Sequence, residues 1–115
     1  QPIQIASTVA INELDDYPFE LSTVYKERRE LVVEHLKDLD FIVQESDATM
    51  FVWAKLPEKF HQDSLKFSLD ILEKSNVAVS PGVGFGKFGE GYIRIALVEN
   101  KQRIRQAMKN IKAAL

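Results

Sequence analysis

The sequence contains no cysteine and only two histidines, His35 and His61. The missing cysteines exclude disulfide frameworks, thiolate metal sites and cysteine nucleophiles. The two histidines have no local partner at ligand spacing, so we expect no metal site. No apolar run approaches the ~18 residues that a membrane span needs, and no signal peptide opens the chain. We therefore expect a cytoplasmic protein without a membrane partner.

Composition and charge leave a globular domain as the remaining class. A length of 115 residues suits one domain, and 45% hydrophobic with 28% charged residues is ordinary for such a fold. The charges are uneven, because residues 91–115 carry six Lys or Arg against one Asp or Glu. A basic end of this kind attracts anions or nucleic acid, although a solvated amphipathic helix face accounts for the same residues. The basic stripe consists of Lys101, Arg105, Lys109 and Lys112.

Hydrophobic spacing and helix-breaking residues predict eight elements. Helices are expected over residues 1–14, from about 19 to 38, from an Asp63 cap to about 75, and from an Asn100 cap to the end. Strands are expected at 41–43, 49–54, 77–79 and 92–97. This order predicts an α+β fold, in which a small mixed or antiparallel sheet of about four strands is covered by helices.

The same spacing predicts which side chains form the core. The second helix is expected to bury one face, made of Val24, Leu31, Val32, Leu36 and Leu39. The third helix is expected to bury three leucines, Leu65, Leu69 and Leu72. The last helix is expected to bury a stripe of Ile104, Ala107, Met108, Ile111 and Leu115. The 49–54 strand is nearly all apolar, which predicts a buried strand with Met50 and Trp53 in the core.

Glycine is absent from most of the chain and concentrated in one segment. All five glycines fall within ten residues: Gly82, Gly84, Gly86, Gly89 and Gly91. Because glycine carries an entropic cost, this density indicates a conformational or binding role beyond a plain turn. Residues 84–89 match G-x-G-x-x-G, but a strand follows them where a dinucleotide site needs a helix. The segment is therefore interpreted as a functional loop, and a plain tight connection between two strands is the alternative.

Arg94 lies in the middle of the apolar strand that follows this loop. Alternation places Ile93, Ile95 and Leu97 on one face of the strand and Tyr92, Arg94 and Ala96 on the other. An arginine in such a strand pairs with an internal carboxylate or binds an external anion, because its planar fork matches a carboxylate or phosphate. The neighbouring glycine loop favours the external anion. Tyr92 either lines the same site or packs at the edge.

Residues 80–97 resemble the C-terminal part of the class I/II aminotransferases, which are pyridoxal-phosphate (PLP) enzymes of fold type I. The resemblance covers nearly the whole chain. Residues 1–12 look like a late helix of the family's large domain, residues 25–29 look like the start of the helix leading into the small domain, and residues 49–53 look like a small-domain strand. The resemblance implies that residues 1–18 are the end of the large domain with a hinge, and that residues 19–115 are the small domain.

The resemblance also implies residue roles. Arg94 takes the place of the arginine that binds the substrate α-carboxylate, and Phe85 takes the place of a pocket aromatic in the preceding loop. The parent enzyme would bind PLP, use an amino acid and a 2-oxo acid as substrates, and form a homodimer. None of the ten lysines lies in the family's Ser-x-x-Lys…Gly-x-Arg context. The chain is thus expected to be a fragment that lacks catalytic residues, binds no PLP by itself and is inactive alone. The alternative is a stand-alone α+β module that binds an anion or nucleic acid.

Overall fold

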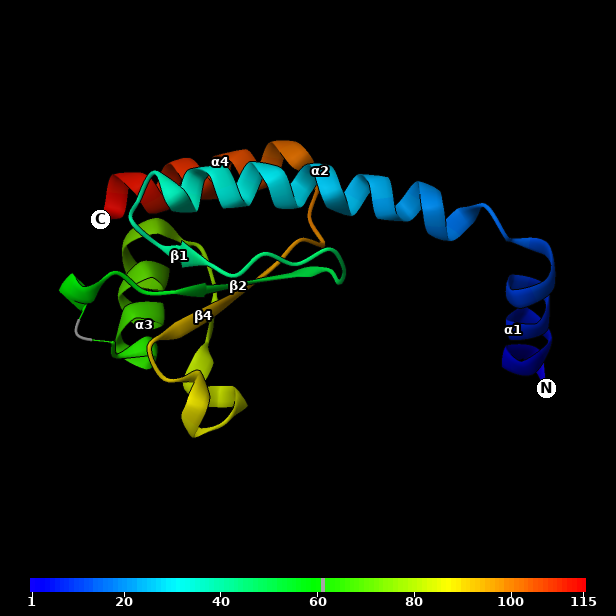
Figure 1. Ribbon diagram of the computed structural model, residues 1–115, viewed down its shortest axis with the longest axis horizontal. Helices are drawn as coiled ribbons and strands as arrows, with labels where there is room; N and C mark the ends of the chain where they lie inside the picture. Colours follow the sequence, from blue (N-terminus) through cyan, green and yellow to red (C-terminus); the bar gives the residue numbers. More distant parts are fainter. Residues whose placement is uncertain (61) are drawn as a thin grey trace.

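The computed structural model describes residues 1–60 and 62–115, so His61 lies outside the described residues. Four helices are present: α1 (Pro2–Glu13), α2 (Tyr17–Lys37), α3 (Ser64–Ser75) and α4 (Lys101–Ala114). The strands are β1 (Ile42–Val43), β2 (Phe51–Lys55), β3 (Ser80–Pro81) and β4 (Tyr92–Ala96). Short 3₁₀ turns are η1 (Glu58–Phe60), η2 (Gly82–Phe85) and η3 (Lys87–Gly89). The predicted order of helices and strands is confirmed, and so is the α+β class (Figure 1).

The four strands form one antiparallel sheet in the order β1-β2-β4-β3. The central pair sets Trp53 opposite Arg94 and Ala54 opposite Ile93. Because side chains alternate across a strand, Ala54 and Ile93 share one face while Trp53 and Arg94 share the other. Helices α2 and α4 run side by side along the sheet, and α3 packs against α4 and β3 (Figure 1).

One hydrophobic core joins these three helices to one face of the sheet. Its most deeply buried members include Leu36 of α2, Ile71 of α3, Met108 of α4 and Ile93 of β4. The predicted stripe of α4 is confirmed for Ile104, Met108 and Ile111, which are buried, whereas Ala107 is half-buried and Leu115 is exposed. Among residues 1–60 and 62–115, no helix combines the length and the apolar character that crossing a membrane requires.

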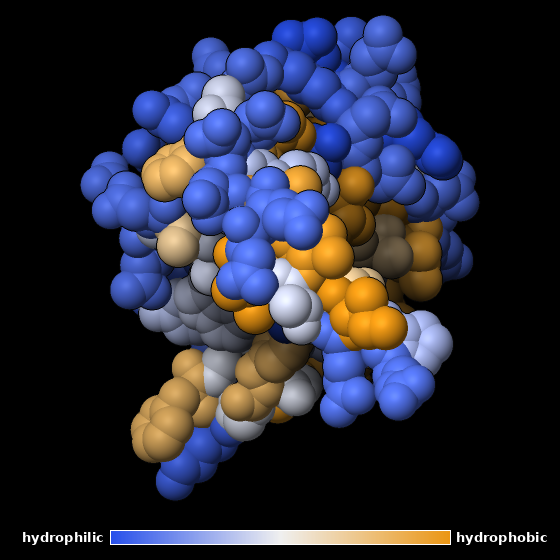
Figure 2. Space-filling model, turned by 90° about the vertical axis from the view of Figure 1, so that its right-hand side faces the viewer, coloured by the Kyte–Doolittle hydropathy of each residue, from blue (hydrophilic) through white to orange (hydrophobic). Residues whose placement is uncertain are grey.

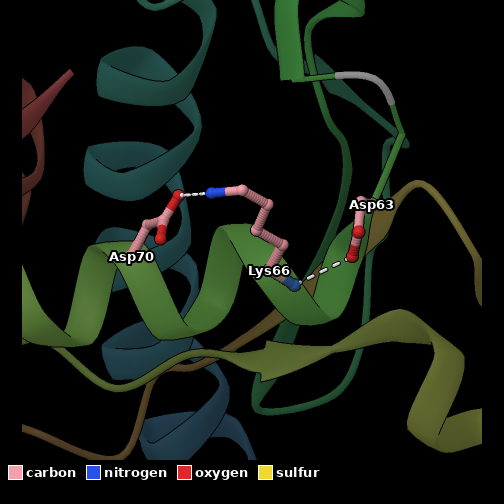
Figure 3. A network of polar contacts seen from close by, with 3 residues as sticks. All are labelled: Asp63, Lys66 and Asp70. Atoms are coloured by element: carbon pink, nitrogen blue, oxygen red, sulfur yellow. Dashed lines mark hydrogen bonds and ion pairs between the residues drawn. The ribbon is translucent and has the colours of Figure 1, made fainter.

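The predicted helix caps are both formed. Asp63 accepts a hydrogen bond from the backbone nitrogen of Lys66 at 2.9 Å, and the Lys66 ammonium pairs with Asp70 one turn later (Figure 3). The hydrogen bond to Asp70 raises the pKa of Lys66 and lowers the pKa of Asp70. Asn100 similarly accepts from the backbone nitrogens of Gln102 and Arg103. These side chains satisfy donors that a helix start leaves free, so they define where α3 and α4 begin.

Helix α1 projects away from the rest of the molecule, and none of its residues is buried (Figure 1). Its exposed apolar side chains include Ile3, Ile5 and Ile11. Figure 2 looks onto this end of the molecule, where hydrophobic side chains gather in the middle of the face below a hydrophilic upper part. Helix α2 begins at Tyr17 rather than Phe19, because Pro18 occupies its first turn, where a missing backbone N–H does no harm. Val24, predicted to be buried, is exposed in this first half of α2.

The predicted core face of α3 is wrong. Leu65, Leu69 and Leu72 are all exposed. The buried face consists instead of Ser64, Phe67, Ser68, Ile71 and Ser75. Its serines are hydrogen-bonded within the helix: Ser68 Oγ donates to the Ser64 carbonyl and Ser75 Oγ to the Ile71 carbonyl. These bonds satisfy the hydroxyl groups that the buried face of α3 carries into the core.

Two strand predictions also need correction. The third strand is Ser80–Pro81 rather than residues 77–79, because the hydrogen-bonded partners of β4 at Arg94 and Ile93 are Ser80 and Pro81. Proline is tolerated there because β3 is an edge strand. Strand β2 is buried on one face only, so Trp53 stands on the opposite face and Met50, before the strand, is exposed.

Candidate functional site

Arg94 lies on the sheet face opposite the helices, half-buried between two aromatic rings. Its guanidinium carbon is 4.1 Å from the centre of the Phe51 ring and 4.2 Å from that of the Phe85 ring. Phe51 comes from β2 and Phe85 from η2 of the glycine loop. Both distances are well inside the range of a cation–π contact. The two rings therefore hold the guanidinium in one position without using its hydrogen-bond donors.

The Nε atom of Arg94 is buried and donates no hydrogen bond to any of the described residues. None of the ion pairs among the described residues involves Arg94. The internal salt bridge that would have explained this arginine structurally is therefore not made within the described chain. Buried polar atoms in proteins are normally hydrogen-bonded. A guanidinium with an unused N–H donor is suited to bind an anionic ligand.

A cavity of about 300 Å³ lies beside Arg94. Its wall combines three residues of the sheet face with polar residues of the connection between β1 and β2: Gln44, Glu45, Ser46, Thr49, Phe51, Trp53 and Arg94. Among the described residues of this wall, Arg94 is the one cation and there is no lysine. The aromatic wall continues to Tyr92, whose ring stacks on Trp53 with centroids 5.5 Å apart. Tyr92 thus lies on the same face as Arg94 and packs against Trp53, but it is not among the described residues that line the cavity.

Phe85 completes this wall from the glycine loop. Its ring meets Trp53 edge to face at 5.7 Å in addition to covering Arg94. The second phenylalanine of the loop, Phe88, is 88% exposed and has no part in the wall. The structure therefore brings together Arg94 and Phe85, the two side chains that the sequence analysis selected.

The glycine loop is closed at its base by two glycines. A Cβ atom on Gly82 would overlap the carbonyl oxygen of Gly89, and one on Gly89 would overlap that of Gly82. Gly91 follows with a φ of +78°, which side chains rarely tolerate. Gly86 has a positive φ too, while Gly84 has open space around it. Four of the five glycines are thus required by conformation or contact, whereas Gly84 is not.

Glu90 connects the end of this loop to the start of α3, a contact that sequence reasoning missed. One of its carboxylate oxygens accepts from the backbone nitrogen of Ser64 at 2.7 Å and from that of Gly91 at 3.0 Å. The bond from Ser64, then that from Gly91, lowers the pKa of Glu90. The Ser64 hydroxyl in turn accepts from the backbone nitrogen of Val83, inside η2. No local sequence signal pairs residues 26 positions apart.

Two further arginines, also missed, fasten α2 to the sheet. Arg28 donates to the carbonyl of Leu97 at 2.8 Å, and Arg29 donates to that of Thr49 at 2.7 Å. Arg29 also lines a cavity of about 440 Å³ between α2 and the β1–β2 connection. Leu97 follows β4 and Thr49 precedes β2. The two arginines therefore hold both central strands at one end, close to the Arg94 cavity.

The remaining candidates lie away from this face. His35 contacts the Leu31 carbonyl within its own helix, at 2.8 Å. Within residues 1–60 and 62–115, no three His, Cys, Asp or Glu side chains come close enough to hold a metal ion. The basic residues of α4 are exposed, and one of them, Lys101, pairs with Glu27 at 3.1 Å.

Comparisons with known proteins agree with the resemblance of the sequence. Residues 2–111 match the family model described as "Aminotransferase class I and II". A putative aminotransferase AatC of Rhizobium meliloti is 51% identical over 99% of this chain, and an LL-diaminopimelate aminotransferase of Natranaerobius thermophilus is 46% identical over 96%. The chain spans only 28% of the length of each of these relatives.

Solved structures show the same fold. The crystal structure of Pyrococcus protein-A1 superposes with a TM-score of 0.90 over 98% of this chain and 29% of its own, at 29% identity. A probable N-succinyldiaminopimelate aminotransferase from Thermus thermophilus is 41% identical, with a TM-score of 0.72 over 80% of this chain and 24% of its own. The match to the family covers nearly every residue that forms the sheet, the glycine loop and the Arg94 site. The chain therefore belongs to the class I and II aminotransferases.

Proposed function

We propose that this chain is the substrate-binding C-terminal part of a PLP-dependent aminotransferase, in which Arg94 binds the α-carboxylate of the substrate. One observation carries the proposal: Arg94 lies between two rings beside a cavity, with a buried Nε that has no partner among the described residues. The reaction would move an amino group from an amino acid to a 2-oxo acid. Both substrates carry a carboxylate next to the reacting carbon, so one anchor serves both.

The chemistry of the site fits a carboxylate. A guanidinium and a carboxylate make two parallel charge-assisted hydrogen bonds, which fix orientation as well as affinity. Phe51 and Phe85 restrict the guanidinium before the substrate arrives, so less side-chain freedom is lost on binding. Trp53 supplies an apolar surface next to the anchor. In this proposal Arg94 orients the substrate, and the loop residue Phe85 shields the ion pair from water.

The residues of this face do not form a site for PLP itself. When bound, PLP acts as the electron sink, and it requires a lysine for its aldehyde and groups for its phosphate and ring nitrogen. No lysine is among the described residues that line the cavity beside Arg94, and the other polar groups there are two aliphatic hydroxyls, an amide and a carboxylate. We propose that the cofactor is held by a large domain of the parent protein, and that residues 1–115 alone neither bind it nor transfer amino groups.

The exposed α1 supports a division of the chain at about residue 18. With no buried residue of its own, α1 would belong to the large domain, and residues 19–115 would be the small domain. The apolar side chains Ile3, Ile5 and Ile11 would then be covered in the parent protein, which we propose is a homodimer. Such exposed apolar patches are uncommon on a complete monomer.

The proposal is tested in the full-length enzyme with Arg94→Ala, Arg94→Lys and the control Arg105→Ala, an exposed arginine of α4. Losing a bidentate charged pair is expected to lower kcat/KM for amino donors by roughly 100- to 1,000-fold. Lysine restores little of this, because it is a point charge without the fork. The visible absorbance of bound PLP and the activity of Arg105→Ala should stay unchanged. Full activity of Arg94→Ala would overturn the proposal, and strong salt-dependent binding of the chain to nucleic acid would favour the alternative module.

A further inference from the structure

Glu90 joins three segments that are separate in the sequence. Its carboxylate accepts from Ser64, the first residue of α3, and from Gly91, which leads into β4. Through the Ser64 hydroxyl the same cluster holds the backbone of Val83 in η2, at 3.2 Å. One polar cluster therefore attaches both ends of the glycine loop, at Val83 and at Gly91, to the N-terminus of α3.

This attachment determines where Phe85 can lie. Val83 and Phe85 belong to the same 3₁₀ turn, η2, so holding the backbone of Val83 also sets the position of Phe85. At the other end, Gly91 is two residues from Ile93 of the core and three from Arg94. The contact between Gly82 and Gly89 closes the loop between these two anchors. Bonds at the base of the loop thus fix the position of the Phe85 ring relative to the Arg94 guanidinium.

The carboxylate is not needed to begin α3. Asp63 already caps that helix by accepting from the backbone nitrogen of Lys66. Glu90 instead uses one oxygen for a bond to the helix and a bond to the loop. Its lowered pKa agrees with a carboxylate that works in its charged form. Glu90 therefore connects α3 to the glycine loop, which Asp63 does not do.

We propose that Glu90 is a positioning residue for carboxylate binding: it holds the glycine loop so that Phe85 covers Arg94. The inference rests on the proposed role of Arg94. Glu90 itself does not reach the substrate in this scheme. It acts through Phe85, so its effect should fall on substrate binding rather than on the transfer step.

The experiment uses the full-length enzyme with Glu90→Gln, and with Glu73→Gln as the matched control, an exposed glutamate of α3. Replacing a charged acceptor by an amide is expected to raise KM for amino donors by roughly fivefold to twentyfold. The value of kcat should change by less than about twofold, the pattern of an interaction present before and during the reaction. Ser64→Ala is the second variant, because it removes the acceptor for Val83 while keeping the backbone nitrogen that binds Glu90. It should raise KM in the same direction.

A double variant tests whether Glu90 acts through Phe85. If it does, Glu90→Gln should raise KM in the wild-type background but have little further effect in Phe85→Leu. Full additivity of the two substitutions, or an unchanged KM in both folded Glu90→Gln and Ser64→Ala, would overturn the inference. The proposed function itself would be contradicted by a different result, namely full activity of Arg94→Ala. Loss of activity in Arg94→Ala together with a normal KM in both Glu90→Gln and Ser64→Ala would remove this inference alone.

Discussion

The guanidinium of Arg94 lies against the ring of Phe85, 4.2 Å from its centre, although one residue belongs to a strand and the other to a glycine-rich loop. The strand supplies a rigid position and the loop supplies a cover. Phe51 provides the opposite ring from the neighbouring strand. The surroundings of the Arg94 guanidinium are therefore built by β2, β4 and the loop together.

Replacing Phe85 by leucine should weaken substrate binding. Leucine keeps the apolar bulk but loses the ring face, so the cation–π contact of Arg94 disappears on one side. We expect KM for amino donors in the full-length enzyme to rise by about threefold to tenfold. Phe88→Leu is the matched control, because that ring is 88% exposed on the same loop. Equal effects of the two substitutions would contradict the role given to Phe85.

The glycines of the loop should differ sharply in their tolerance of alanine. In Gly82→Ala the new methyl group overlaps the Gly89 carbonyl, so the base of the loop must open. We expect a loss of more than about 2 kcal/mol in unfolding free energy. Gly84→Ala adds a methyl group to open space and restricts the unfolded chain, so it should be neutral or stabilising by up to about 1 kcal/mol. Urea unfolding of both variants checks the contrast, and a strongly destabilised Gly84→Ala would refute it.

Stability should depend on pH through Glu90, with a defined sign. Its pKa is lowered in the folded chain, chiefly by the Ser64 backbone hydrogen bond. The stabilisation is therefore fully present above the unfolded pKa of about 4.3 and is lost as pH falls through the lower folded value. The stability difference between wild type and Glu90→Gln should be largest at neutral pH and shrink in acid. Asp63 and Asp70 are unchanged in both proteins, so their titration cancels; a difference that grows in acid would contradict this assignment.

The sequence singled out Arg94 and Phe85, which the structure brings into contact, because the signal there is local. Five glycines within ten residues and an arginine at an alternating strand position are both visible without knowing the fold. Glu90 was missed for the opposite reason. Its partner Ser64 lies 26 residues earlier, and only packing of α3 against the loop brings the two together.

The predicted strand at residues 77–79 is misplaced because a run of apolar residues does not show which residues pair with the neighbouring strand. Val77 and Val79 do pack against the core, but the bonds to β4 are made by Ser80 and Pro81. In β2 a continuous apolar run was read as burial on both faces. Its second face instead carries Phe51 and Trp53, which form the wall of the Arg94 cavity. Apolar side chains that line a cavity on the open face and apolar side chains of the core look alike in sequence.

Helix α3 offers the strictest test of the corrected core, because adjacent residues should respond oppositely. Ile71 is 2% exposed and packs at the centre of the core, whereas Leu72 is 46% exposed. Ile71→Ala should therefore lower the unfolding free energy by about 2–5 kcal/mol, the cost of a buried cavity. Leu72→Ala should cost less than about 1 kcal/mol, since alanine compensates through its higher helix propensity. Urea unfolding of the two variants decides between the faces: a larger loss for Leu72→Ala would restore the leucine stripe as the buried side and would contradict the packing described for α3.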